Sequence, residues 1–253
     1  MKKIAIITGA SGGIGQEFVR ELAKESLDEI WVTGRNEKRL LALREEYGEV
    51  ITPICKDLTQ SADLLSFTDL LEEQNPSVLW LVNNAGIARM APSKDFSFSE
   101  LEQTIDLNCK APAALINLCI PYMGRGAKIL NISSASAFQP VPYLNLYAAT
   151  KAFERSYSRA LNAELKPCGI TVTAVCPGWV DTEMLSKEIN GKKVRFPGIT
   201  TPERVVKKAL KDAKKGRDMS ICSLYVKCQH LNVKLLPQKL TMKIWLHGIK
   251  NYL

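Results

Sequence analysis

Residues 2–23 read KKIAIITGASGGIGQEFVRELA. The apolar run that ends at Thr8 predicts a buried strand, and Phe18, Val19 and Leu22 recur at the spacing of a helix. Between them lies a glycine-rich turn whose candidate binding residues are Gly9, Ser11, Gly12, Gly13, Ile14 and Gly15. Glycine lets the backbone approach a pyrophosphate closely, and the first N–H groups of the helix bind the anion. Strand, turn and helix in this order predict the first part of a dinucleotide-binding unit.

The second strand, from Glu29 to Thr33, bears on which dinucleotide is bound. An acidic residue at its end would accept hydrogen bonds from a ribose 2′-hydroxyl, but this chain continues with Gly34-Arg35-Asn36. The Arg35 guanidinium can pair with a 2′-phosphate in a bidentate manner. We therefore expect NADP(H), with NAD(H) as the alternative if Arg35 is only a solvated residue at the start of the next helix.

The rest of the chain alternates in the same way. We expect strands at 50–55, 78–82, 127–132, 170–175 and 219–223, and helices at 61–74, 99–123, 147–166 and from Thr201. A chain of 253 residues with 46% apolar content is most simply one domain. The pattern predicts an α/β fold over residues 1–253: a single-domain, Rossmann-like, doubly wound parallel sheet of about seven strands, with helices on both faces.

Ligands of such sheets bind at the carboxyl ends of the strands. The candidates there are Asp57, Leu58, Asn84, Ala85 and Gly86. Asp57 could accept a hydrogen bond from an adenine amino group, although an aspartate after a strand is as often a turn former or a helix cap.

Pro112 lies inside the helix expected at 99–123. Proline has no N–H, so the carbonyl four residues back, that of Asn108, loses its partner. The consequence is either a simple kink or a place where a water is held.

Tyr147 and Lys151 are four residues apart in a stretch with helical character, Tyr147-Ala148-Ala149-Thr150-Lys151. The two side chains would then lie on one helix face, with an ammonium beside a phenol. A nearby cation lowers the pKa of a phenol, and bringing it from about 10 to about 7 requires roughly 4 kcal/mol. The pair alone is a weak signal, and its surroundings decide what it means.

With these elements in order, the chain resembles the short-chain dehydrogenase/reductase family. The matching motifs are Thr8-Gly9-x-x-x-Gly13-Ile14-Gly15, Asn83-Asn84-Ala85-Gly86, Asn108, Ser134, Tyr147-x-x-x-Lys151 and Pro177-Gly178. The resemblance covers residues 1–182 and implies the strand order 3-2-1-4-5-6-7. It also implies a homodimer or homotetramer that uses the helices before and after Ser134 as its interface.

The resemblance implies a role for each matching residue. Tyr147 would be the general acid or base, Lys151 would bind ribose hydroxyls and lower the Tyr147 pKa, and Ser134 would bind the substrate oxygen. Asn108 would hold a water through its carbonyl. The residues that would grip the nicotinamide end are Pro177, Gly178, Val180 and Thr182. Ser133 and Ser136 compete for the serine role, but Ser133 should point to the opposite side of its strand.

These roles predict an NADPH-dependent carbonyl reductase, or the reverse alcohol dehydrogenase, for a small carbonyl or alcohol substrate. We expect an apolar ketone or aldehyde, because Trp179 and nearby apolar residues would line the pocket. Those neighbours are Phe138, Val141, Tyr143 and Met184. The alternative is a non-catalytic NADP(H)-binding regulatory or scaffold protein, against which the complete set of Ser134, Tyr147, Lys151 and Asn108 argues.

The seven cysteines are scattered without the spacing of a disulfide framework or a zinc site, so we expect neither a disulfide nor a metal. The first apolar run is too short for a signal peptide, and we expect a cytoplasmic protein. The formal charge of +8 lies in the C-terminal segment, where residues 200–253 contain 12 Lys and Arg against 3 Asp and Glu.

The resemblance becomes vague after Thr182. Residues 183–200 show little regular pattern and would form a substrate lid. Residues 224–253 form a basic helical extension of two amphipathic stretches, broken at Pro237. This extension could pack on the domain or a second subunit, or it could contact a membrane surface peripherally through its lysines, Trp245 and leucines. We do not expect a nucleic-acid partner, because the basic residues form no recognition motif.

Overall fold

Apolar residues on both faces of the strands build a buried, seven-stranded sheet. The computed structural model describes residues 1–185, 188–189, 192–193 and 196–249. The strands of this sheet are β1 (Lys3–Thr8), β2 (Glu29–Gly34), β3 (Ile51–Cys55), β4 (Ser77–Asn83), β5 (Lys128–Ile132), β6 (Thr171–Val175) and β9 (Met219–Ser220). All neighbours pair in parallel, in the order β3-β2-β1-β4-β5-β6-β9. The predicted Rossmann-like α/β fold and strand order are confirmed.

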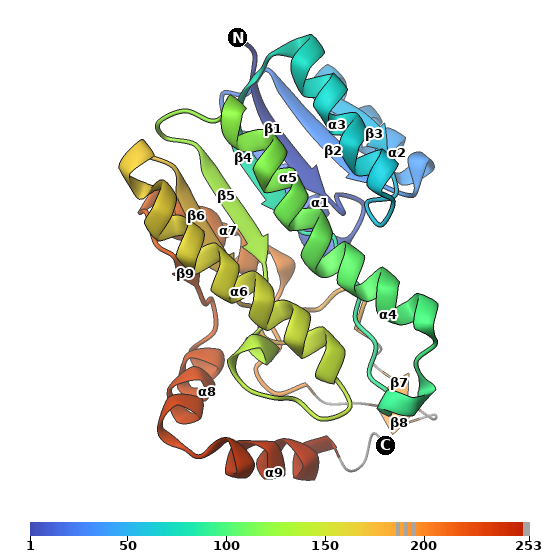
Figure 1. Ribbon diagram of the computed structural model, residues 1–253, viewed down its shortest axis with the longest axis vertical. Helices are drawn as coiled ribbons and strands as arrows, with labels where there is room; N and C mark the ends of the chain where they lie inside the picture. Colours follow the sequence, from blue (N-terminus) through green and yellow to red (C-terminus); the bar gives the residue numbers. More distant parts are fainter. Residues whose placement is uncertain (186–187, 190–191, 194–195, 250–253) are drawn as a thin grey trace.

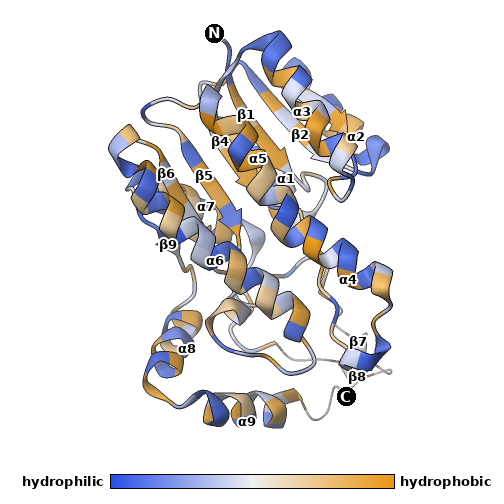
Figure 2. Cartoon of the chain, viewed as in Figure 1, coloured by the Kyte–Doolittle hydropathy of each residue, from blue (hydrophilic) through white to orange (hydrophobic). Residues whose placement is uncertain are grey.

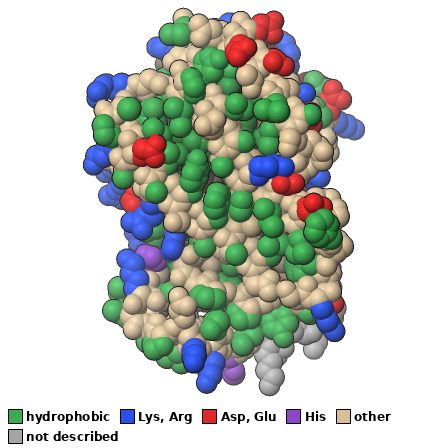
Figure 3. Space-filling view, in the orientation of Figure 1, with side chains coloured by type: hydrophobic (Ala, Val, Ile, Leu, Met, Phe, Trp, Pro, Cys, Tyr) green, Lys and Arg blue, Asp and Glu red, His purple; other side chains and the backbone are tan. Residues whose placement is uncertain are grey.

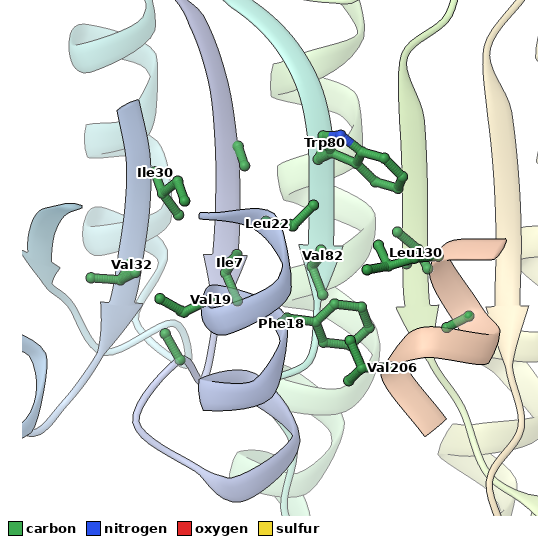
Figure 4. Close-up of a cluster of buried hydrophobic side chains, with 14 of the residues drawn as sticks. Ile7, Phe18, Val19, Leu22, Ile30, Val32, Trp80, Val82, Leu130 and Val206 are labelled. Carbon is green, nitrogen blue, oxygen red and sulfur yellow. The ribbon is translucent and has the colours of Figure 1, made fainter. Parts of the chain in front are cut away.

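Helices cover both faces of the sheet (Figure 1). On one face, α1 (Gly13–Leu22), α2 (Glu37–Tyr47) and α7 (Pro202–Lys214) pack on Ile7, Val32 and Val82. Figure 4 shows this layer, with Phe18 and Val206 meeting beside the strands. On the other face, α3 (Ser61–Gln74), α5 (Ala111–Cys119) and α6 (Asn145–Leu165) form a second core.

The helix predicted at 99–123 is three segments instead of one. It consists of α4 (Phe98–Ile105), a π-helical turn (Asp106–Lys110) and α5, and a short 3-10 turn at Ile120–Tyr122 follows. The Ala111 N–H donates to the Asp106 carbonyl, five residues back. Pro112 explains the widened turn, because it cannot donate the bond that an α-helix needs at that position.

The region expected to be an irregular lid contains a short antiparallel pair, β7 (Glu188–Ile189) with β8 (Lys192–Lys193). The rest of the lid prediction at 186–187, 190–191 and 194–195 lies outside the described residues. Val180 also forms a bridge with Thr200, so the chain returns to the sheet edge before α7 begins.

The C-terminal extension forms α8 (Leu224–Leu235) and α9 (Gln238–Ile249), with the predicted break at Pro237. Both helices lie at the end of the molecule remote from the N-terminus (Figure 1). Val226 is buried against a small core that includes Phe138, and the Trp245 indole N–H donates to the Pro142 carbonyl at 2.9 Å. Within the described residues, no helix has the length and apolar character needed to cross a membrane.

Candidate active site

The glycine turn after β1 is shaped by very close backbone contacts. Gly9 has φ +61°, and a Cβ there would lie 2.8 Å from Ala85 Cα. A Cβ at Gly15 would lie 2.2 Å from the Gly9 carbonyl oxygen. These two positions therefore require glycine. The turn opens on a cavity of about 490 Å³ lined by Ser11, Gly13, Gln16, Asp181, Thr182, Glu183 and Leu185.

The ends of β1 and β4 are tied together beside this turn. The Thr8 hydroxyl oxygen accepts from the N–H groups of Asn84 and Ala85, both at 2.9 Å. The Asn84 amide donates to the carbonyls of Thr8 and Gly9 at 3.1 and 3.0 Å. Asn84, Ala85 and Gly86 thus lie at the sheet edge next to the glycine turn, as the sequence predicts, with the Asn84 side chain holding the turn.

Arg35 follows β2 and is exposed at the same edge of the sheet. Arg39, one turn further along α2, pairs with Glu183 at 3.0 Å. Arg39 was not predicted, although a second arginine four residues after Arg35 was a visible signal. Arg35 is exposed near the end of β2, where an anionic group could bind, whereas Arg39 is already paired with Glu183.

Asp57 is engaged in a local turn. Its Oδ1 accepts from the N–H and the hydroxyl of Thr59, at 3.0 and 2.9 Å. Leu58, beside it, is buried with 3% of its surface exposed. The structure thus uses Asp57 as a turn former, one of the two alternatives that the sequence left open, and its second carboxylate oxygen is the one that could face an adenine.

Tyr147 and Lys151 lie one turn apart on α6. Lys151 Nζ lies 5.6 Å from the centroid of the Tyr147 ring. The lysine is buried, and its ammonium donates to the Ile132 carbonyl at the end of β5 and to Glu154 Oε2, each at 2.7 Å. The ammonium and the phenol are therefore neighbours, as their spacing predicts.

The two serines after β5 have different partners. Ser133 is buried, and its hydroxyl donates to the Lys151 carbonyl at 2.7 Å. Ser134 is half-buried, and its hydroxyl oxygen accepts from the Ser136 N–H at 3.1 Å. Ser133 is thus used to hold α6 against the sheet, and Ser134 is the serine that keeps a hydroxyl hydrogen to donate.

Asn108 lies in the π-helical turn and is fully buried. Its side-chain amide joins two elements: Oδ1 accepts from the Ile87 N–H, and Nδ2 donates to the Ile87 carbonyl and the Thr150 hydroxyl, at 3.0, 2.9 and 3.0 Å. A Cβ at Gly86 would lie 3.2 Å from Asn108 Oδ1 and 3.3 Å from Lys151 Nζ. The side chain of Asn108 therefore brings the segment after β4 close to the lysine, a role that the sequence analysis did not assign to it.

The segment after β6 closes the site on its other side. The Pro177 carbonyl accepts from the Ala135 N–H at 2.8 Å, and Thr182 lies against Gly13, where a Cβ would be 2.9 Å from the threonine methyl carbon. Val180 is buried in the core. Of these predicted residues, Thr182 lies against the glycine turn and Pro177 is tied to the segment after β5.

Trp179 connects the site to the C-terminal extension. Its ring lies 4.9 Å from the Phe196 ring and stacks on the Trp245 ring of α9 at 6.5 Å. A Cβ at Gly178 would lie 2.7 Å from a Val226 methyl carbon of α8. Phe138, expected in the pocket, packs instead on His230 of α8 at 4.1 Å. The extension thus packs against the segment after β6 and against Phe138.

Burial and pairing shift the ionisation of the groups around Lys151. Burial raises the pKa of Glu154 to about 7, even though Lys151 opposes that change. Burial disfavours the Lys151 ammonium, but the Glu154 carboxylate and Tyr147 stabilise it, and the pKa of Lys151 is raised. Glu154 was not predicted as a site residue, although an acidic residue three positions after Lys151, on the same side of the helix, was a visible signal.

Comparison with known proteins identifies the family. The model of the short chain dehydrogenase family matches residues 3–193. The very-long-chain 3-oxoacyl-CoA reductase of Anas platyrhynchos is 34% identical over 218 residues, which cover 81% of this chain and 67% of that protein.

Two solved structures are similar over nearly the whole chain. A short-chain dehydrogenase from Sphingobium yanoikuyae in complex with NADPH has a TM-score of 0.79 and 30% identity, and the match covers 95% of each chain. The bulky-bulky ketone specific alcohol dehydrogenase from Comamonas testosteroni has a TM-score of 0.74 and 28% identity over 95% of this chain and 94% of that one. The chain belongs to the short-chain dehydrogenase family of oxidoreductases.

Proposed function

We propose that the protein is an NADP(H)-dependent oxidoreductase that interconverts a ketone or aldehyde and the corresponding alcohol. The observation that carries the proposal is the Lys151 ammonium, 5.6 Å from the centre of the Tyr147 ring at the carboxyl edge of the sheet. Ser134 lies just after β5 and has a hydroxyl hydrogen to donate. Together these three groups are suited to protonating a carbonyl oxygen.

The residues at the sheet edge fit a nicotinamide dinucleotide. Gly9 and Gly15 leave no room for a side chain, and the cavity beside them is lined by Ser11 and Thr182. Arg35 and Arg39 are the groups that would hold a 2′-phosphate, so NADP(H) is favoured and NAD(H) is the alternative. NADPH, when bound, supplies the hydride that reduces the carbonyl carbon.

Tyr147, Lys151 and Ser134 would together carry out the proton transfer to the carbonyl oxygen. The Tyr147 hydroxyl donates its proton to the carbonyl oxygen, and the Lys151 ammonium stabilises the phenolate that is left. The Ser134 hydroxyl donates a hydrogen bond to the same oxygen and orients it. In the reverse direction the Tyr147 phenolate removes the proton of an alcohol, so one arrangement serves both reactions.

We infer an apolar carbonyl substrate from the aromatic residues that pack on Trp179, after β6. The Trp179 ring stacks on the Trp245 ring and packs on the Phe196 ring. These three rings would form an apolar wall of the substrate pocket. Two similar proteins are consistent with this class, since one is a 3-oxoacyl-CoA reductase and the other is specific for bulky ketones. We also infer a cytoplasmic homodimer or homotetramer that uses α5 and α6 as its interface, where Phe153 is 40% exposed.

The test is turnover of NADPH and NADH with a panel of ketones and aldehydes, with wild type beside Tyr147→Phe. General acid catalysis contributes about 10²–10⁴-fold, so Tyr147→Phe should lose at least about 100-fold in kcat while NADPH still binds. Tyr157→Phe, on the same helix and half-buried, is the matched control. NADPH binding without turnover of any substrate would favour the non-catalytic alternative, and an equal preference for NADH would reject the role of Arg35.

We further propose that α8 and α9 contact an anionic membrane surface peripherally. Eight large apolar side chains are exposed there: Leu224, Tyr225, Leu231, Leu235, Leu236, Leu240, Ile244 and Leu246. Exposed lysines at 227, 234, 239 and 243 lie among them, and the sequence from 219 to 253 has no Asp or Glu. This combination suits an anionic lipid surface, because leucine inserts below the headgroups while lysine pairs with them.

A further inference from the structure

Lys151 and Glu154 form a buried ion pair beside Tyr147, the proposed catalytic residue. Glu154 Oε2 accepts from Lys151 Nζ at 2.7 Å, and the two side chains are only 2% and 5% exposed. They are three residues apart on α6, on the same face as Tyr147. Two charges buried this deeply are stable only when each has a partner.

The Glu154 carboxylate has Lys151 as its partner. Oε2 accepts from Lys151, whereas Oε1 is buried and has no hydrogen-bond partner among the described residues. The nearby Ser158 hydroxyl donates to the Glu154 backbone carbonyl instead of the carboxylate. A carboxylate that is satisfied at one oxygen and unpaired at the other depends on the Lys151 ammonium to remain ionised.

Hydrogen bonds fix the position of the Lys151 ammonium. Two of its three N–H donors are engaged by the Ile132 carbonyl and by Glu154. Its Nζ also lies where a Cβ on Gly86 would be 3.3 Å away, so the ammonium faces the segment after β4. Glu154 therefore determines both where the ammonium lies and how much of its positive charge is felt at Tyr147.

We propose that Glu154 is a positioning residue for the proposed reaction: its carboxylate is the counter-ion that holds the Lys151 ammonium in place and keeps it charged, so that the pH dependence of turnover reflects Glu154 as well as Tyr147. This inference rests on the proposed carbonyl reduction. It names a residue that acts through Lys151 and does not itself touch the substrate.

The other ionisable groups around Glu154 cannot replace it in this role. Cys109 from the π-helical turn and Cys176 after β6 both interact with the Glu154 charge, but burial raises their pKa values to about 11 and about 12. Both thiols are therefore neutral near pH 7. Burial raises the pKa of Glu154 and the Lys151 ammonium opposes that change, so Glu154 is the carboxylate paired with this ammonium.

Removing the Glu154 charge should lower the pKa of Lys151. Without its counter-ion, the buried Lys151 ammonium loses the interaction that offsets its desolvation. Carbonyl reduction needs a charged ammonium beside Tyr147, so the alkaline limit of activity shifts to lower pH.

The experiment compares pH profiles of kcat for ketone reduction at saturating NADPH in wild type, Glu154→Gln, Glu154→Asp and Glu164→Gln. In Glu154→Gln the alkaline limb should move to lower pH by about one unit, which lowers kcat about fivefold at the pH of the wild-type midpoint and about tenfold well above it. Glu154→Asp keeps the charge and should leave the alkaline limb near its wild-type position. This variant also provides a test if Glu154→Gln does not fold. Glu164, exposed on the same helix, is the matched control and should leave the profile unchanged.

A Glu154→Gln profile that matches wild type would overturn the inference, while turnover lost in Tyr147→Phe would leave the proposed function intact. If wild type turns over no substrate, the proposed function fails first, and the ion pair is then tested directly. Titration of the Lys151 Nζ by ¹⁵N NMR, assigned with Lys151→Met, should show its pKa lower in Glu154→Gln by about one unit. An unchanged Lys151 titration would reject the role of Glu154 whatever the reaction.

Discussion

The first strand and the last two helices are both rich in large apolar residues, but only the strand buries them. In β1, Ile4, Ile6 and Ile7 are fully buried between the two helical layers. In the extension, Leu224 is 75% and Leu235 is 73% exposed. The same residue type thus stabilises the fold in one region and forms a surface in the other, so apolar content alone does not reveal which role a segment has.

The extension is attached to the domain at a small number of points. Val226 and Ile249 are buried, and Trp245 reaches the loop before α6 through its hydrogen bond to Pro142. Figure 2 shows that apolar residues also occur around the outer sides of α8 and α9. In Figure 3, side chains of Lys and His appear among apolar side chains at this end of the molecule. We infer that the extension contributes little to the stability of the fold, and that its exposed side chains serve to contact a partner or a surface.

The largest difference between the two regions should appear in a matched pair of leucine substitutions. Leu22 on α1 is fully buried, so Leu22→Ala should lower the free energy of unfolding by about 2–5 kcal/mol through lost burial and the cavity left behind. Leu235→Ala on α8 should change it by less than about 0.5 kcal/mol. Chemical denaturation of both variants measures the difference. A loss at Leu235 as large as that at Leu22 would show that the extension is part of the core.

The fold was predictable from local patterns because each element repeats a simple rule. The predicted bounds of α3 agree with those in the structure, and Thr201, the predicted start of α7, caps this helix by accepting from the Arg204 N–H. The break at Pro237 and the different partners of Ser133 and Ser134 also follow from short-range geometry. In these places the residue and its immediate neighbours determine the structure.

What the sequence did not predict depends on residues far apart in the chain. Glu154 looks like an ordinary helix surface residue until the tertiary fold buries it against β5 and the π-helical turn. The contact of Trp245 with Pro142 spans more than one hundred residues. The i,i+3 spacing of Lys151 and Glu154 is visible in the sequence, but the burial of this pair and the contact of Trp245 with Pro142 both depend on how the layers pack.

A second, smaller effect should come from the junction where the sheet ends and the extension begins. Asp212 on α7 is buried and accepts from the Arg217 guanidinium at 2.9 Å and from the Ser220 hydroxyl of β9 at 2.7 Å, and it also pairs with Lys208. Asp212→Asn should destabilise the fold by about 1–3 kcal/mol at pH 7, because the partners lose a buried charged acceptor. Asp69→Asn, exposed on α3, is the control.

The pH dependence of this effect has a defined sign. Burial alone would raise the pKa of Asp212, but the bonds from Lys208 and Ser220 hold it below the ordinary value of 3.8. A carboxyl whose folded pKa is lowered contributes stability above its unfolded pKa and loses it as pH falls through the folded one. The difference between wild type and Asp212→Asn should therefore be full at pH 6 and shrink below about pH 4. A difference that persists at pH 2 would assign the effect to packing.

A third effect, smaller again, tests how α8 is attached. A Cβ at Gly178 would lie 2.7 Å from a Val226 methyl carbon, so Gly178→Ala should cost about 1–2 kcal/mol of stability through overpacking. Val226→Ala makes room for the added methyl group, and the double variant should be more stable than the sum of the two single changes by at least about 0.5 kcal/mol. Gly124→Ala, where a Cβ would meet open space, is the control. Strict additivity would mean that α8 shifts freely away from Gly178.

The smallest effect on folding should come from the exposed face of the extension, where substitution should change binding instead. Leu231, Leu235 and Ile244 are each more than half exposed, so replacing all three with Gln should leave the unfolding transition within about 0.5 kcal/mol of wild type. The same variant should lose at least about tenfold in co-sedimentation with vesicles that contain phosphatidylglycerol, because these side chains would no longer insert among the lipids.

Two controls distinguish insertion of this face into an anionic bilayer from a general effect of removing exposed leucines. Leu65→Gln, at a site 63% exposed on α3, should leave vesicle binding unchanged. Phosphatidylcholine vesicles, or high salt with a Debye length of about 3 Å at 1 M, should weaken binding of the wild type, because the lysines at 227, 234, 239 and 243 then lose their attraction. If wild type does not bind anionic vesicles but the triple substitution lowers its oligomeric state, the apolar face is covered by a second copy of the chain and not by lipid. The contrast with β1 would then still hold, because the leucines of the extension would find their partners outside their own domain.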